Sequence, residues 1–451
     1  MAPTDASSAQ PGLAPPAHRG GFWLGRLTAA LKKLYIQVLI AITMGIALGS
    51  WYPSLGADMK PLSDAFILLI RAFVPPIIFM TVLVGIGKMG DLRQVGRVGL
   101  RALIYFELVS TAALIIGLAV ANIVQPGAGA HIDPASLDPK AASAYAEDAK
   151  SLTLVAFLLS MIPTNLFGAL AKGEIMPILV SGVLLGFALC RMGERGRRVV
   201  ELADDVTHAL FGVVRIIMYL APLAAFAAMA FTVGKFGFKT LGSLGQVIAS
   251  VYVTSILFVL LGFGLIARLF GLRVLKLLRY FREELLIAFS ATSGEAMIPR
   301  AIDKLEAMGC AREVVGLVLP TGFSFNMDGT AIYLSTAVLF IAQATDIHLS
   351  FGQQLTILLV MLFTSKGAAG VTGGGFVALA ATLPVVDSLP IGGLALVVGI
   401  ERFMAEIRAV TNLFSNIFAT VVVAKWLGRL DEKRATLVLD RKAAVPGMLR
   451  P

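Results

Sequence analysis

The sequence has few charged residues, and this scarcity excludes an ordinary soluble protein. Only 15% of its 451 residues are Asp, Glu, Lys or Arg, whereas 57% are hydrophobic and the mean hydropathy is +0.84. Soluble domains carry about 25% charged residues. Several apolar runs reach about 20 residues, the length needed to cross the ~30 Å hydrocarbon core of a bilayer. The composition therefore predicts an all-α polytopic membrane protein that lies in a lipid bilayer.

Cysteine and histidine are also rare, which argues against several kinds of reactive site. Cys190 and Cys310 lie far apart at the ends of apolar segments, without the spacing of a metal site or of a disulfide framework. The four histidines are scattered, and the chain has no HExxH, GxSxG or P-loop motif. We therefore expect no cofactor and no enzyme activity.

The basic residues are unevenly distributed along the chain. The net charge of +10 could suit a nucleic-acid partner, but Lys and Arg gather in short clusters between apolar segments. Such clusters mark cytoplasmic loops under the positive-inside rule, so no nucleic-acid partner is expected. The pattern predicts cytoplasmic N- and C-termini. The Ala-, Pro- and Ser-rich start predicts a disordered N-terminus at residues 1–30. The segment 125–150, which is poor in Lys and Arg, is predicted to be an external loop, and the charged segment 428–451 a cytoplasmic tail.

After about residue 280 the alternation of simple spans ends. Residues 285–299 are apolar but too short to cross and return, with a polar centre, SATSGE, and basic residues on both sides. Residues 355–383 form a similar unit, interrupted by SKGAAGVTGGG and without basic flanks. We predict two re-entrant hairpins, the first entering from the cytoplasm and the second from outside. Paired Gly-interrupted segments indicate a transporter's substrate site, although one such tip alone more often reflects tight helix packing.

Between the two hairpins, the run GFSFNMDGTAIY at 322–333 interrupts another apolar span. Asp328 and the carbonyl of Asn326 are hard oxygen donors that suit a small cation. Gly329 allows the helix to unwind, and the Thr330 hydroxyl can donate to a carboxylate. We therefore expect a helix to break here and to hold substrate and coupling ion.

The last span, 394–426, carries charged residues at membrane depth. At 100° per residue, one helical stripe collects a set of polar and small side chains: Glu401, Ala405, Arg408, Asn412 and Asn416. Arg408 could form a structural ion pair with Glu401, or its planar fork could await an anionic ligand. Arg402 and Glu406, spaced i,i+4 on a neighbouring face, could pair with each other. An anion fork beside cation oxygens favours symport.

These residues resemble the dicarboxylate/amino acid:cation symporter family, which includes the glutamate transporters. NMDGT, the two hairpins and the RxxxN of the last span agree with it in order and spacing, over nearly the whole chain after residue 30. The resemblance implies eight transmembrane helices plus two re-entrant helical hairpins, a glutamate-transporter-like elevator fold, and a homotrimer in the bacterial inner membrane. It also implies a division of the chain into a scaffold and a transport domain. The scaffold has spans one and two at 31–96 and spans four and five at 151–240. The transport domain has span three at 97–124 and the segment 241–427, which holds span six, hairpin one at about 277–308, span seven at about 314–343, hairpin two at about 352–386 and span eight at about 390–427.

Two positions of the last span differ from the family's amino-acid carriers. Those carriers have an Asp for the substrate's α-amino group and a Thr after the Arg, where this chain has Ala405 and Ala409. The resemblance assigns the two carboxylate grips to Arg408 and Asn412. A site with both grips and no ammonium acceptor is similar to the C4-dicarboxylate branch, to which SKGAAGVTGGGF and ERFMAEIRAVTN are also close. The resemblance implies further substrate contacts: Thr330, Thr292, Ser293, Val371, Gly373 and Gly375.

The cation sites match the family less well. Asn416 stands where the family has a carboxylate, and Phe106 and Val109 replace a Tyr and a Thr of span three. Ser110 persists, and Glu107 is expected to be a buried acid. The candidate coupling-ion residues are Asp328, Asn326, Asn416, Gly322, Ser324, Ser365, Glu107 and Glu401. Because sodium lacks several ligands here, protons are the expected coupling ion, with sodium at these residues as the alternative.

The function that we expect is a secondary active symporter that imports succinate, fumarate and malate from periplasm to cytoplasm. A glutamate/aspartate:cation symporter is the nearest alternative. A sensor or channel built on the same fold is the alternative from another class, although a midplane arginine would oppose cation flow through a channel.

Overall fold

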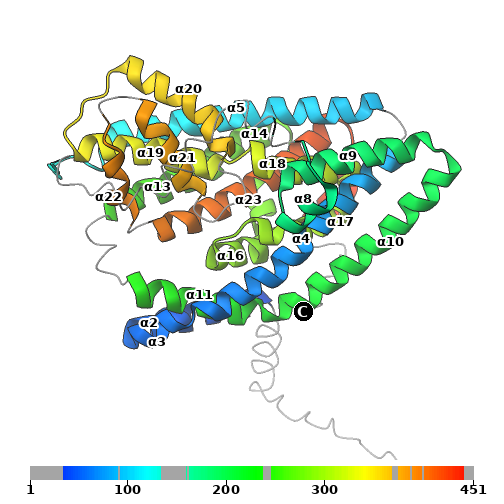
Figure 1. Cartoon of the computed structure of the whole chain (residues 1–451), viewed down its shortest axis with the longest axis horizontal. Coiled ribbons are helices and arrows are strands. Elements are labelled where there is room, and N and C mark those ends of the chain that lie inside the picture. The colour runs from blue at the N-terminus through cyan, green and yellow to red at the C-terminus, as the bar shows by residue number, and fades with distance from the viewer. Residues whose placement is uncertain are drawn as a thin grey trace, which may run out of the picture.

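The computed structural model of the chain is a bundle of helices (Figure 1). The structure describes residues 34–89, 92–133, 159, 162–236, 245–367, 374–385, 389–398 and 401–440. Within these ranges the regular structure is helical, apart from an isolated β-bridge between Cys310 and Leu430. The prediction of an all-α polytopic protein is therefore confirmed. The expected disordered N-terminus lies outside the described residues, as do most of the external loop and the tip of hairpin two.

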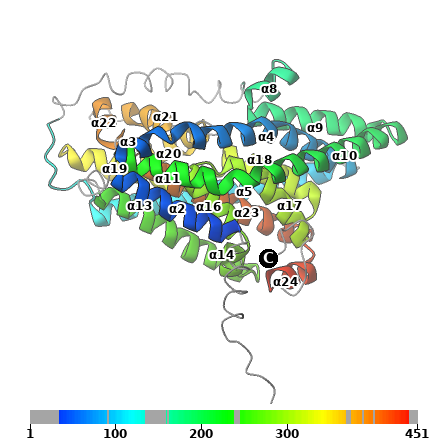
Figure 2. The same cartoon turned by 90° about the horizontal axis from the view of Figure 1, so that it is seen from below.

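The first half of the chain supplies α2 (Leu34–Trp51), α3 (Pro53–Asp58), α4 (Lys60–Met89), α5 (Leu92–Val124), α8 (Leu166–Lys172), α9 (Ile175–Arg191), α10 (Glu194–Ile217), a 3₁₀ turn (Met218–Leu220) and α11 (Ala221–Phe236). α5 packs mainly against α19 (Asp328–Ala344) of the second half, and the other helices form two groups. In one group α11 packs along α2 and α3, and in the other α4 packs against α9 and α10. Figure 2 shows α11 lying alongside α2 and α4.

Glycine allows α2 and α11 to cross closely. A Cβ added at Gly45 would lie 2.4 Å from the carbonyl oxygen of Phe226, and one added at Gly49 would lie 2.6 Å from that of Ala230. The two glycines are one turn apart on α2. This small-xxx-small spacing is the one by which membrane helices bring their backbones together.

The second half of the chain is made of shorter helices around one long helix, α23: α13 (Gly245–Leu257), a π turn (Phe258–Gly262), α14 (Phe263–Leu269), α15 (Val274–Tyr280), α16 (Arg282–Ala291), a 3₁₀ turn (Glu295–Met297), α17 (Ile298–Met308), α18 (Arg312–Phe325), α19 (Asp328–Ala344), α20 (Phe351–Gly367), α21 (Gly374–Thr382), 3₁₀ turns at Leu383–Val385 and Ile391–Gly393, α22 (Leu394–Val398), α23 (Glu401–Trp426) and α24 (Glu432–Leu439). α23 contacts α5, α13, α16, α18 and α19, so it forms the centre of this half.

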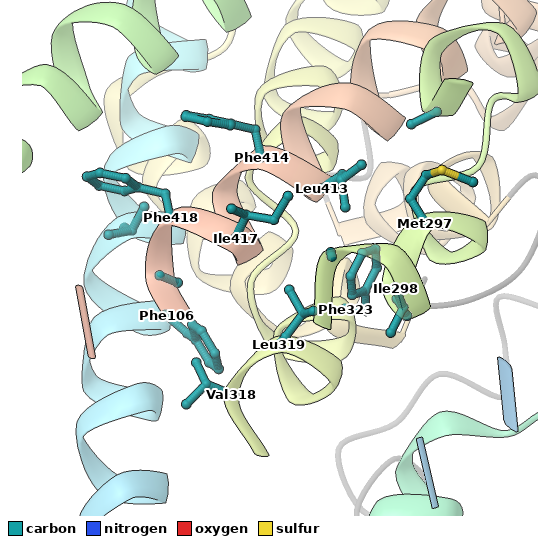
Figure 3. Packing of buried hydrophobic residues seen from close by; sticks show 14 of the residues in the cluster. Phe106, Met297, Ile298, Val318, Leu319, Phe323, Leu413, Phe414, Ile417 and Phe418 are labelled. Carbon is teal, nitrogen blue, oxygen red and sulfur yellow. The ribbon is translucent and has the colours of Figure 1, made fainter. Parts of the chain in front are cut away.

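Large apolar side chains fill the space around α23. Figure 3 shows Leu413, Phe414, Ile417 and Phe418 of α23 among the other labelled side chains of this core, and Phe106 of α5 lies close by. Phe106 is fully buried there. Position 106, where the resembled family has a tyrosine, therefore carries an apolar ring without an oxygen.

Within the part of the chain that the structure describes, five helical stretches are long and apolar enough to cross a membrane: Val95–Val124, Glu194–Lys235, Gly245–Leu269, Arg312–Ala344 and Phe403–Trp426. The last two are almost wholly buried by the rest of the protein, whereas less than half of the most apolar stretch of the first and third is buried. Exposed apolar surface suits lipid, and polar residues are tolerated in the enclosed pair. The family's count of eight spans and two re-entrant hairpins, and the domain boundaries, stay predictions.

Hairpin one, formed by α16 and α17, has charged residues buried between its arms. The carboxylate of Glu284 is fully buried and pairs with Arg300 Nε at 2.8 Å and with Lys304 Nζ at 2.7 Å. Arg300 also binds Glu283 at 2.7 Å, and the Tyr280 hydroxyl donates to the Lys304 carbonyl oxygen at 3.1 Å. These contacts fix the two arms to each other.

A C-terminal strap (residues 427–440) covers the base of hairpin one. Ala311 N donates to the carbonyl oxygen of Arg429 at 3.0 Å, and Asp431 N donates to that of Gly309 at 2.9 Å. From α24, Arg434 Nε donates to the Ala307 carbonyl oxygen at 2.8 Å. The strap therefore joins the end of α23 to hairpin one.

Candidate functional site

The NMDGT run is a helix break, as the sequence predicts. α18 ends at Phe325 and α19 begins at Asp328, and Asn326 (φ −125°, ψ 68°) and Met327 (φ −102°, ψ 58°) between them are not helical. Gly329 lies inside α19, and its role differs from the one expected. A Cβ there would lie 2.8 Å from Thr411 Cβ, so this glycine lets α23 approach closely and does not form the break.

Asn412 of α23 caps the N-terminus of α19. The first amides of a helix have no partner within it. Asn412 Oδ1 accepts from Gly329 N at 2.8 Å and from Thr330 N at 3.3 Å, and Asn412 Nδ2 donates to Thr330 Oγ1 at 3.1 Å. The two residues are thus brought together, and Nδ2 keeps a second hydrogen for another acceptor.

Asp328 lies in a buried network of hydroxyl and amide groups. Its carboxylate is fully buried and accepts a hydrogen bond from Ser110 Oγ of α5 at 2.8 Å and one from Ser415 Oγ of α23. Asn326 Nδ2 donates to Ser415 Oγ at 2.7 Å and to Asn416 Oδ1 at 3.0 Å. Three segments, α5, the helix break and α23, therefore meet at one acid.

One oxygen of this network has no donor. Asn326 Oδ1 is buried and has no hydrogen-bond partner among the described residues. A buried acceptor of this kind is costly unless a proton donor or a cation reaches it. With the Asp328 carboxylate and the hydroxyls of Ser110 and Ser415, it forms a set of hard oxygen ligands at the break.

Arg408 forms an ion pair within α23. Nη2 lies 2.6 Å from Glu401 Oε1 and Nη1 lies 3.3 Å from Glu401 Oε2, so the carboxylate is held by both arms of the fork. The Arg408 guanidinium lies 4.4 Å from the centre of the Tyr333 ring on α19. The Arg408 side chain is 8% exposed and that of Glu401 is 19% exposed. Of the two alternatives for Arg408, the ion pair is thus present in this structure.

Both hairpins approach the same face of α23. A Cβ at Gly375 of α21 would lie 2.5 Å from Arg408 Nη1. A Cβ at Gly294, in the turn of hairpin one, would lie 3.0 Å from the Ala409 carbonyl oxygen. Thr292 and Ser293 precede that glycine, and Thr292 has a left-handed conformation (φ 50°). Val371 and Gly373, expected substrate contacts of hairpin two, lie outside the described residues.

The other expected residues occupy several places. Gly322 of α18 lies against Asn416, because a Cβ there would come within 2.2 Å of Asn416 Oδ1. Ala405 is half-buried on α23, on the stripe that holds Arg408. Ser324 and Ser365 are buried on α18 and α20.

Glu107 does not lie at the site, so the expectation of a buried acid there is wrong. The buried face of α5 includes Phe106 and Ser110, whereas the side chain of Glu107 is exposed, as are those of the neighbouring Ile104 and Leu108. Span three is apolar on nearly all sides, so its sequence did not reveal which face packs against α19.

Ser415 is a site residue that sequence reasoning missed. It bonds both Asp328 and Asn326. The sequence feature that points to Ser415 is its position three residues after Asn412, which places it close to the same face of the helix.

The broken α18–α19 pair, the buried arginine and the two glycine-bearing hairpins define a membrane transporter of the symporter class. A model of the sodium:dicarboxylate symporter family matches residues 34–426 of the chain. The chain belongs to this family, and the family resemblance noted from its motifs is confirmed.

Proposed function

We propose that the protein is a proton-coupled symporter of C4-dicarboxylates such as succinate, fumarate and malate. The observation that carries this proposal is the ion pair in which Arg408 holds the carboxylate of Glu401 by both arms of its fork. A carboxylate of the substrate makes the same two bonds, so Glu401 occupies the position that a substrate carboxylate takes over. Symport of the sodium:dicarboxylate type is the family's activity.

The surroundings of Arg408 suit this exchange of partners. The Tyr333 ring, 4.4 Å away, supports the guanidinium through a cation–π contact that does not depend on Glu401. Glu401 is the more exposed partner, and it belongs to the first turn of α23, where α22 has ended. A substrate that displaces it leaves the arginine in place.

The second carboxylate of the substrate is assigned to Asn412 and Thr330. Arg408 and Asn412 are four residues apart on α23, about 6 Å along the helix axis. The free hydrogen of Asn412 Nδ2 and the Thr330 hydroxyl are donors on that side. Two anion grips at this short spacing fit a four-carbon dicarboxylate.

The site favours a dicarboxylate over an amino acid because of one small residue. Ala405, one turn before Arg408 on the same stripe, has no oxygen with which to accept hydrogen bonds from an ammonium group. An amino acid would lose the hydration of that charge without gaining a partner. Aspartate should therefore compete less well than succinate.

Protons are proposed as the coupling ion because of the ligands around Asp328. At two positions where the family has oxygen ligands, this chain has Phe106 and Val109, which are buried in the apolar core. Asn416, where the family has a carboxylate, brings no charge. Sodium needs several oxygens at once to replace its water, whereas a proton needs one placed acid. Asp328 and Glu401 are such acids.

The proposal includes the homotrimer, the elevator movement and an inner-membrane location with both termini in the cytoplasm. The first two are supported by the family resemblance, and the orientation by the basic clusters of the sequence.

Competition for uptake tests the substrate assignment. Proteoliposomes that contain the purified protein should take up labelled succinate in a saturable way. Fumarate and malate should compete strongly and aspartate weakly. Equal or stronger competition by glutamate would assign the chain to the amino-acid carriers instead.

A further inference from the structure

Glu406 is a buried acid that the proposed substrate site does not use. Its side chain is 2% exposed, in the membrane-crossing part of α23. It lies two residues before Arg408, which turns it by about 200° around the helix. Arg408 faces α19 and α21, and Glu406 faces α13 through Tyr252.

The phenol of Tyr252 lies between two hydrogen-bond acceptors, one of which is Glu406. The phenol oxygen lies 2.9 Å from the Phe403 carbonyl oxygen and 3.4 Å from Glu406 Oε2. A phenol has one proton, and the carbonyl at the shorter distance takes it. Glu406 Oε2, at the longer distance, is the second acceptor that the same hydroxyl can reach.

A second arrangement is available to the same three groups. If Glu406 loses its proton, the phenol can turn its hydrogen from the Phe403 carbonyl to the carboxylate. An ionised carboxylate at membrane depth is costly, and a phenol donor offsets part of that cost. Tyr252 thus has a hydrogen bond to make in either state of the acid.

The surrounding groups suit a functional site. The π turn Phe258–Gly262 follows α13 directly, and such turns are frequent at functional sites. One turn after Tyr252 on α13, the Ser255 hydroxyl is buried with no hydrogen-bond partner among the described residues. Arg402 lies four residues before Glu406 on α23, with its side chain outside the described residues.

Titratable groups on the other helices packed against α23 are directed elsewhere. Asp328 is bonded by Ser110 and Ser415, and Glu284 is paired with Arg300 and Lys304. Tyr333 lies against Arg408, and Glu107 of α5 is exposed.

We propose that Glu406 binds a coupling proton of the symporter, with Tyr252 as its hydrogen-bond partner. This inference rests on the proposed function, since it assigns a role in the same transport cycle. The proton binds to the carboxylate when the site opens to one side of the membrane and dissociates to water when it opens to the other. It moves together with the substrate because α23 also carries Arg408 and Asn412.

The test measures protons carried per succinate. Proteoliposomes with a pH-sensitive dye inside are given labelled succinate, and proton entry and succinate entry are recorded together. Glu406→Gln should carry one proton fewer per succinate than the wild type, and the pH profile of its succinate exchange should differ from that of the wild type. Glu406→Asp should restore the stoichiometry. Glu201→Gln, an exposed acid on α10, serves as the matched control and should behave as the wild type does.

Tyr252→Phe is the second variant, used if Glu406→Gln does not fold. It should keep the stoichiometry and shift the midpoint of the pH profile. An unchanged stoichiometry and pH profile in Glu406→Gln, or an unchanged profile in Tyr252→Phe, would overturn the inference. Lower thermal stability with unchanged stoichiometry would also overturn it and would indicate a structural pair with Arg402. Wild-type protein that moves no dicarboxylate at all would contradict the proposed function itself, and the inference with it.

Discussion

Two buried ion clusters in this protein differ in how firmly their partners are held. At the base of hairpin one, Glu284 is fully buried and pairs with two cations, Arg300 and Lys304. On α23, Arg408 has one carboxylate partner, Glu401, which is partly exposed and belongs to the same helix. The first cluster can lose a partner only by leaving a charge uncompensated. In the second, we propose that an anion from solution replaces Glu401. The comparison separates charges that stabilise the fold from charges to which we assign ligand binding.

The largest effect is expected from Arg408→Ala, which should abolish dicarboxylate transport and leave the folded protein largely intact. Loss of a charge-assisted, two-armed contact in a dry site costs about 3 kcal/mol, or roughly two decades in affinity. Succinate binding and uptake measure the loss, and size-exclusion chromatography checks folding. Arg429→Ala, at a half-exposed arginine of the strap, is the control and should transport normally.

A structural role for the Arg408–Glu401 pair would give a different pattern. Arg408→Ala would then fail to assemble, and the double variant Glu401→Gln, Arg408→Gln would restore assembly. That result would make the two clusters alike and would contradict the comparison.

The next largest effect should come from Glu284→Gln, and it should concern stability. Removing this acid leaves Lys304 buried without its carboxylate partner, which costs about 3–5 kcal/mol. The unfolding temperature in detergent should fall clearly. Glu283→Gln, which removes only the more exposed contact with Arg300, should lower it much less. If both variants unfolded at the wild-type temperature, the cluster would not stabilise the hairpin.

The sequence predicted the part of the site that depends on spacing within one helix. Arg408 and Asn412 share a face of α23, and NMDGT breaks a helix against that face, as their patterns indicate. Glu107 was misplaced because the apolar residues of span three give no amphipathic signal for its buried face. The C-terminal strap and the pairing of Glu284 with Lys304 depend on contacts between distant segments, which a single sequence does not reveal.

A smaller effect is expected where hairpin two approaches Arg408. Gly375→Ala puts a methyl group about 2.5 Å from Arg408 Nη1, and the flexible guanidinium must shift. The KM for succinate should rise several-fold, while the maximal rate and the unfolding temperature change little. Gly352→Ala is the matched control, because its new methyl group would lie 4.0 Å from the nearest atom. Equal kinetics in the two variants would mean that α21 does not position the arginine.

The most direct test of the account is accumulation of succinate against its gradient with one ion gradient at a time. In proteoliposomes, an inward proton gradient without sodium should drive accumulation of labelled succinate, and an inward sodium gradient at equal pH should not. The reason is the ligand set around Asp328, where Phe106 and Val109 bring no oxygen and Asn416 brings no charge. Accumulation that needs sodium and persists after the proton gradient is collapsed would contradict the account. It would mean that Asp328, Asn326 and the nearby hydroxyls form a sodium site after all.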